Sequence, residues 1–169
     1  MAEFNIEKYK QRAYRKKKRL AKFLRLVGKS NVKGLLKITA EIDKEVWKEV
    51  NCLDCANCCK KMTPTYSKKD INRISKHLNM TYKEFYDKWL KKERNKDIVN
   101  KSTPCQFLGK DNKCGIYEIR PADCREFPHT TKRDFRYQAS ERIYTQNLKF
   151  CPATLVFVEK LQKAIEADL

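Results

Sequence analysis

The sequence predicts a mainly α-helical fold, a small single domain whose helices surround a cysteine-rich loop and a short β-hairpin. Three observations support this prediction. Apolar residues recur at helical spacing in several segments, only 4 of the 169 residues are glycine, and eight residues are cysteine. Hydrophobic residues make up 41% of the chain and charged residues 36%. A modest helical core is therefore expected rather than a large sheet.

Two amphipathic helices are predicted in the first fifty residues. The first covers about Ile6–Val27, and Gly28 with the polar residues after it is expected to end it. The second covers about Val32–Val50 and leads the chain into the cysteine-rich loop. Apolar residues along both segments step by three or four, which places them on one face of a helix. They are Ile6, Tyr9, Ala13, Leu20, Leu24 and Val27 in the first helix, and Leu35, Ile38, Ile42, Val46 and Val50 in the second.

Two further helices are indicated by their starts. Ser67 is followed three residues later by Asp70, and Thr81 by Glu84. A hydroxyl with an acid three residues on is typical of a helix N-terminus, because each side chain can bond the other residue's backbone N–H. The second of these helices is predicted to cover Tyr82 to about Lys92.

The remaining elements are short until the C-terminal helix. The segments Cys105–Leu108 and Cys114–Tyr117 are separated by a turn-rich stretch that begins at Gly109, which predicts a small hairpin or paired knuckle. Pro121 is expected to begin a short helix that carries Cys124. A last helix is predicted over Ala153–Ala167. The expected organisation is one compact domain with basic helices in 1–49, a cysteine region in 50–152 and a C-terminal helix in 153–169.

The cysteines are the most informative residues. Four of them form a C-x2-C-x2-C-C run, at Cys52, Cys55, Cys58 and Cys59, and four more follow at Cys105, Cys114, Cys124 and Cys151. Structural disulfides are one interpretation of an even cysteine count. No secretory signal and no membrane span is visible, so we expect a cytoplasmic protein whose thiols stay reduced, where such spacing favours metal.

Eight thiols are enough for two four-thiolate sites, and the metal stays open between zinc and iron. C-x2-C pairs recur in zinc sites, whereas C-x2-C-x2-C also holds three irons of a 4Fe-4S cluster in bacterial ferredoxins. Arg120 and Arg125 flank a ligand cysteine and are predicted to support the anionic site. His77 is interpreted as a surface residue, and His129 as a ligand only if one thiol is spare.

This pattern resembles a known family. The run from Cys52 to Cys59, the Cys105-Gln-Phe-Leu segment and the stretch from Cys114 through Cys124 are similar to the YkgJ-type cysteine-cluster family, described as zinc- or iron-chelating proteins. The resemblance implies that all eight cysteines are metal ligands. Relatives include the flagellin lysine N-methylases, for which an iron-sulfur cluster and S-adenosylmethionine are implied. A metal-dependent protein-modifying enzyme is therefore an alternative, although the chain has no G-x-G-x-x-G loop.

The charge is strongly positive, with 39 Lys and Arg against 21 Asp and Glu, a net charge of +18. Eleven of these cations lie between Lys8 and Lys29, with only Glu3 and Glu7 among the same first 30 residues. That segment could bind polyanions weakly and without sequence preference. A zinc-braced nucleic-acid-binding protein is accordingly a third interpretation. The alternative is that the basic helix is an ordinary solvated face.

Overall fold

A computed structural model describes residues 5–130 and 141–167 of the chain. The chain divides into two compact units. One is formed by Met1–Cys55 with Pro128–Leu169, and the other by Ala56–Phe127. The first unit is therefore discontinuous in sequence. The acidic N-terminal residue Glu3 and the last two residues of the predicted C-terminal region lie outside the described residues.

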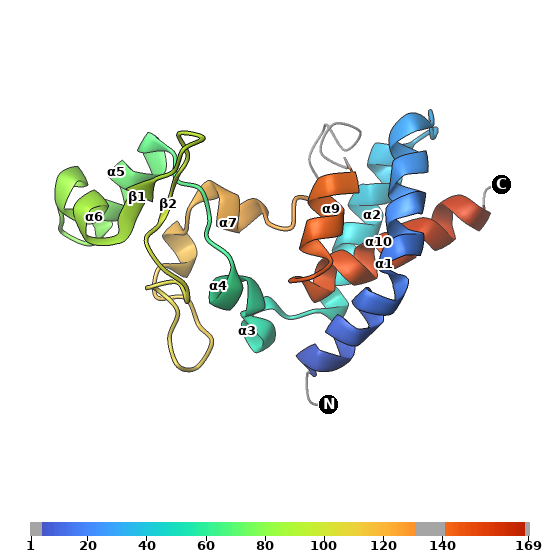
Figure 1. The fold of residues 1–169 in the computed structure, drawn as a ribbon, viewed down its shortest axis with the longest axis horizontal. Helices are drawn as coiled ribbons and strands as arrows, with labels where there is room; N and C mark the ends of the chain where they lie inside the picture. Colours follow the sequence, from blue (N-terminus) through green and yellow to red (C-terminus); the bar gives the residue numbers. More distant parts are fainter. Residues whose placement is uncertain (1–4, 131–140, 168–169) are drawn as a thin grey trace. The chain divides into compact units, whose positions relative to one another are not determined.

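The first unit is a bundle of helices (Figure 1). Its helices are α1 (Ile6–Lys29), α2 (Leu35–Glu49), the single turn α3 (Cys52–Cys55), α9 (Glu141–Asn147) and α10 (Pro152–Ala167). Helix α10 packs against both α1 and α2, and α9 packs against α1. Leu155, Phe157, Val158 and Leu161 of α10 are fully buried. This apolar surface joins the buried faces of α1 and α2 into one hydrophobic core.

Ion pairs flank this core on both sides of α10. Glu159 is 7% exposed, and its carboxylate accepts hydrogen bonds from Arg12 and from Lys16 of α1, the latter at 2.6 Å. Burial acts to raise the pKa of Glu159, but these two cations outweigh it and lower the pKa. On the other side, Lys160 contacts Glu45 at 2.9 Å and Glu49 at 2.7 Å on α2. Charged side chains thus connect α10 to both helices that it covers.

The second unit combines short helices with one β-hairpin. Its elements are α4 (Asn57–Lys61), α5 (Lys68–His77), α6 (Tyr82–Trp89), β1 (Leu90–Lys92), β2 (Ile98–Asn100), the 3₁₀ turn η1 (Tyr117–Ile119) and α7 (Ala122–Glu126). The two strands are antiparallel, and Leu90 pairs with Asn100. Its core cluster contains Tyr66, Ile71, Ile74, Phe85, Leu90 and Ile116. Phe85 is at the centre of this cluster, with Trp89 and Phe107 against its ring.

The mainly helical class predicted from sequence is confirmed. Both predicted helix starts in the second unit are complete capping boxes, at Ser67 with Asp70 and at Thr81 with Glu84. The helix predicted over Ala153–Ala167 begins one residue earlier, at Pro152. None of the described helices is long and apolar enough to cross a membrane.

Several predicted boundaries were wrong. The first helix continues to Lys29, because Gly28 is helical and Ser30 closes the last turn through its backbone N–H and hydroxyl. The second helix begins at Leu35, after Gly34 adopts a left-handed conformation with φ of 70°. The helix from Tyr82 ends at Trp89 instead of Lys92, because residues 90–92 pair with β2.

The regular β-hairpin lies elsewhere than predicted, whereas the alternative, a paired knuckle around Cys105 and Cys114, is present. The hairpin strands lie at residues 90–92 and 98–100 and contain no cysteine. The segments around Cys105 and Cys114, predicted as a small hairpin or paired knuckle, are paired by an antiparallel bridge between Leu108 and Cys114. The Gly109 N–H bonds the Lys113 carbonyl and the Gly115 N–H bonds the Phe107 carbonyl, both at 2.8 Å. Helix α9 was not predicted.

Replacing Glu159 with Gln should lower the free energy of unfolding by about 1–3 kcal/mol at neutral pH, because two cations lose a charged acceptor. The pKa of Glu159 is lowered in the folded protein, so its contribution is present above the unfolded pKa and is lost as acid protonates the folded carboxylate. The difference between parent and Glu159→Gln in thermal unfolding should therefore shrink below about pH 4. Glu41→Gln, at an exposed position of α2, is the matched control. A pH-independent difference would contradict this account.

Candidate metal centre

The C-x2-C-x2-C-C run is not one continuous helix. Cys52 and Cys55 lie on the single turn α3 and belong to the first unit, whereas Cys58 and Cys59 lie on α4 in the second. Between the two turns Ala56 has a φ of 46°, a left-handed conformation that is unfavourable for a residue with a Cβ. Ala56 is nevertheless 3% exposed. A buried backbone reversal therefore divides the run into two pairs of thiols.

The second unit brings Cys59, Cys105, Cys114 and Cys124 into one neighbourhood. Cys105 donates its backbone N–H to the carbonyl of Cys59 at 2.8 Å, and Leu108, three residues further on, bridges to Cys114. Burial raises the pKa of the Cys124 thiol, and the charges of the other three thiols raise it further. The sulfur of Cys58 lies 3.9 Å from that of Cys59. Five of the eight predicted ligands, on α4, two loop segments and α7, thus lie within a single unit.

A buried polar network lies beside these thiols. Asn100 is fully buried at the end of β2, and its Oδ1 accepts hydrogen bonds from the Tyr66 hydroxyl at 2.8 Å and from Gln106 Nε2 at 3.1 Å. Its Nδ2 has no hydrogen-bond acceptor among the described residues. Burial raises the pKa of the Cys105 thiol, whereas the Asn100 amide acts to lower it. The two donors to Oδ1 leave the N–H group of Asn100 available to the cysteine sulfur.

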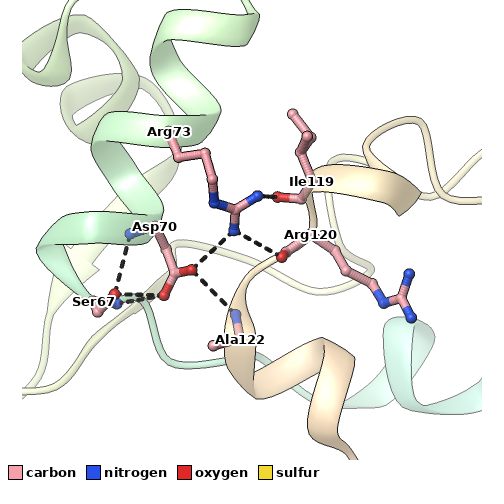
Figure 2. Close-up of polar contacts among 6 residues, drawn as sticks. All are labelled: Ser67, Asp70, Arg73, Ile119, Arg120 and Ala122. Carbon is pink, nitrogen blue, oxygen red and sulfur yellow. Dashed lines mark hydrogen bonds and ion pairs between the residues drawn. The ribbon is translucent and has the colours of Figure 1, made fainter.

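The helix that carries Cys124 is held by polar contacts from α5 (Figure 2). Asp70 Oδ1 accepts a hydrogen bond from the Ala122 N–H at 3.2 Å and is paired with Arg73 at 3.0 Å. Arg73 donates to the carbonyl oxygens of Ile119 at 2.7 Å and Arg120 at 3.0 Å. The Thr65 N–H also bonds the carboxylate of Asp123 at 2.9 Å, next to Cys124. These contacts satisfy backbone groups at the start of α7 and fix where it begins.

The two predicted supporting arginines lie on either side of Cys124 in sequence. Arg120 donates to the Tyr117 carbonyl at 2.6 Å and lies over the Tyr117 ring, 3.8 Å from its centroid. In Figure 2 its side chain extends away from the Asp70 and Arg73 contacts. Arg125 is exposed on α7. Their support of the thiolates stays a prediction.

The histidines occupy different units. His77 is exposed at the end of α5, where a surface residue was predicted. His129 belongs to the first unit, and its carbonyl accepts a hydrogen bond from the Tyr144 hydroxyl at 3.0 Å.

Cys151 is a half-buried thiol of the first unit. It lies immediately before α10, and burial raises the pKa of its thiol to about 11. The backbone N–H groups of Ala153 and Thr154 and the Thr154 hydroxyl act in the opposite direction, while the charge of Cys52 raises the pKa. Thr154 is fully buried, and its hydroxyl has no other hydrogen-bond partner among the described residues. Cys52 and Cys151 are therefore neighbours in the first unit.

The cysteine thiols and the hydrogen-bond donors beside them suit a thiolate-bound metal. The thiols lie near one another but are not arranged as a complete set of metal ligands. Nowhere in residues 5–130 and 141–167 do three His, Cys, Asp or Glu side chains converge closely enough to hold an ion as they lie. None of the eight cysteines, all of which lie in the described residues, forms a disulfide. A buried amide and a buried hydroxyl each face a cysteine with an unused N–H or O–H, and such donors stabilise a sulfur that carries negative charge. This chemistry suits zinc or iron.

Comparison with known proteins agrees with this chemistry. Residues 51–152 match the CxxCxxCC family, described as "Putative zinc- or iron-chelating domain". The chain belongs to this family. An uncharacterized protein of Methanocaldococcus jannaschii, MJ0661, is 31% identical over 88 residues, which cover 48% of this chain and 46% of that protein. This chain thus matches about half the length of that relative. No solved structure matches this chain. The family supports metal binding as the general function.

Arg73→Gln should weaken the attachment of the Cys124 helix, because the carbonyls of Ile119 and Arg120 and the carboxylate of Asp70 all lose a charged donor. We expect a loss of about 1–3 kcal/mol in unfolding free energy and faster release of bound metal to a chromogenic chelator. Lys76→Gln makes the same charge change at an exposed position on the same helix. Metal release at the parental rate from Arg73→Gln would show that the α5 contacts do not position Cys124.

Asn100→Asp should lower metal affinity by about 10–100-fold, the usual effect of losing a residue that supports metal ligands. The substituted carboxylate keeps an acceptor for Tyr66 and Gln106 but replaces the N–H group with a negatively charged oxygen beside Cys105. Competition with a chelator of known affinity measures the change. Asn72→Asp, exposed on α5, controls for the added charge. Equal affinities for Asn100→Asp and Asn72→Asp would remove Asn100 from the site.

Proposed function

We propose that this protein binds zinc or iron through cysteine thiolates, and that Cys59, Cys105, Cys114 and Cys124 form a four-thiolate site within the second unit. The observation that carries the proposal is the gathering of these four thiols in one unit, with the fully buried Asn100 amide beside Cys105. Backbone bonding between Cys105 and Cys59, and the bridge from Leu108 to Cys114, support the grouping. The family description supports the metal.

Electrostatics favours metal over four neutral thiols at this site. Partly buried sulfurs close to one another resist ionisation, because each negative charge loses water and repels its neighbours. A divalent cation reverses both effects, and its binding releases the thiol protons. Four thiolates around one zinc still leave a formal charge of minus two. The Asn100 amide is suited to stabilise that charge, and Arg120 and Arg125 are proposed to do so as well.

The remaining cysteines extend the proposal. Cys52, Cys55 and Cys151 belong to the first unit, and we propose that they also bind metal, with Thr154 supporting Cys151. Cys58 is proposed as a ligand that can replace Cys59, because their sulfurs are neighbours. A reducing compartment such as the cytoplasm would keep all of these thiols available. Zinc would brace the fold, whereas a 4Fe-4S cluster would add electron transfer.

Anaerobic purification followed by metal and acid-labile sulfide analysis tests the proposal. We expect thiolate-bound metal, with sulfide present only if the site holds an iron-sulfur cluster. Cys105→Ser and Cys124→Ser should each lose the metal of the second unit and lower the melting temperature, because coordination energy is also folding energy. Cys151→Ser should retain that metal.

His77→Ala is the control and should change neither metal content nor melting temperature, since exposed substitutions usually fall within about 0.5 kcal/mol. A folded, metal-free protein with eight freely titratable thiols would overturn the proposal. Equal metal loss from Cys124→Ser and Cys151→Ser would overturn the grouping of the four thiols while leaving metal binding in place.

A further inference from the structure

The outer face of α1 carries a row of cations at heptad spacing. Lys8, Arg15, Lys22 and Lys29 are seven residues apart, and Lys18 and Arg25 lie between them on the same face. All six are exposed. An α-helix rises about 1.5 Å per residue, so cations seven residues apart lie about 10.5 Å from each other and the row is about 30 Å long. One side of α1 thus presents a row of positive charge.

Five of the six cations in this row are not paired with an acid in the described part of the chain. No ion pair within the described residues involves the following five cations of the row: Lys8, Arg15, Lys18, Lys22 and Lys29. Lys10 pairs with Glu7, and Arg12 and Lys16 pair with Glu159 of α10. These three cations lie off the row. Mutual repulsion along the row costs free energy that a polyanion would offset.

The opposite face of α1 is already occupied. Leu20, Leu24 and Val27 are almost completely buried against the rest of the bundle. A helix that lies on a lipid surface needs its apolar face free to enter the headgroup region. Among the described residues of α1, the exposed large apolar side chains are Tyr14, 84% exposed, and Leu26, 56% exposed. The free face is therefore cationic, which disfavours a membrane as the partner.

We propose that this cationic row of α1 binds the phosphate backbone of duplex nucleic acid. The row matches about one helical turn of a duplex, which is about 34–36 Å. A duplex is stiff and holds its phosphates in regular lines. Helix α1 likewise holds the cations of the row at regular spacing. Single-strand binding relies on several stacked aromatic side chains. Among the described residues of α1, Tyr14 is the one exposed aromatic side chain, so a single strand is a poor match. Lysine and arginine contacts to phosphate position a protein without reading sequence, so no sequence preference is expected.

Fluorescence anisotropy with a 20-base-pair DNA duplex, an RNA duplex and a single strand of the same sequence tests the proposal. The variant Arg15→Gln, Lys18→Gln, Lys22→Gln, Lys29→Gln keeps good helix formers on an exposed face. The slope of log K against log salt is negative, and each lost phosphate contact makes it less steep by about 0.9. The four changes should therefore make it less steep by about 3–4. The two duplex arms identify whether DNA or RNA is preferred.

The matched control is Lys68→Gln, Lys69→Gln, Lys76→Gln, Lys91→Gln, which removes the same charge from exposed positions of the second unit. This control should change the steepness of the salt dependence by less than about 1, the equivalent of one phosphate contact. Metal content is measured in every variant and should not change, which separates this proposal from the metal site. Equal slopes in both variants, tighter binding to the single strand or to phosphatidylserine vesicles, or no duplex binding by the parent would each overturn the proposal.

Discussion

The order of the second unit depends on a small apolar core and on the polar contacts that Asp70 makes beside it. Within Ala56–Phe127, all of which the structure describes, the core cluster holds six buried side chains, and five of them lie between Tyr66 and Leu90. Small cores of this kind usually need a further constraint such as a metal. The loops that carry Cys105 and Cys114 pack on this cluster through Phe107 and Ile116, whereas α7, which carries Cys124, is held by polar contacts. Asp70 is the centre of those contacts, since it caps α5, pairs with Arg73 and bonds the start of α7.

Local signals in the sequence were sufficient for much of the fold. The capping pairs at Ser67 and Thr81 act within one helical turn, so their residues alone predict where α5 and α6 begin. Ends that depend on distant residues were missed. Leu90 leaves the helix because it pairs with Asn100, ten residues away. The position of a short hairpin and the existence of α9 likewise depend on tertiary packing, which overrides weak local propensity.

The site was predictable in its chemistry and not in its grouping. Cysteine spacing indicated the ligands, but spacing alone gave no reason to separate Cys52 from Cys59, because the reversal at Ala56 has no glycine or asparagine to signal it. Asn100 and Thr154 were missed for a different reason. An isolated asparagine or threonine has no pattern in sequence, and each becomes informative only when burial leaves one of its hydrogens without an acceptor.

The discontinuity of the first unit sets an order of events during synthesis of the chain. Its core is completed by α10, so the apolar faces of α1 and α2 must wait for Leu155, Phe157 and Leu161 to leave the ribosome. The second unit is continuous, and all of its thiols have been made by Cys124. A metal ion could therefore be captured there while the flanking helices are still unpartnered. Premature release of such an intermediate would expose apolar surface, which favours aggregation.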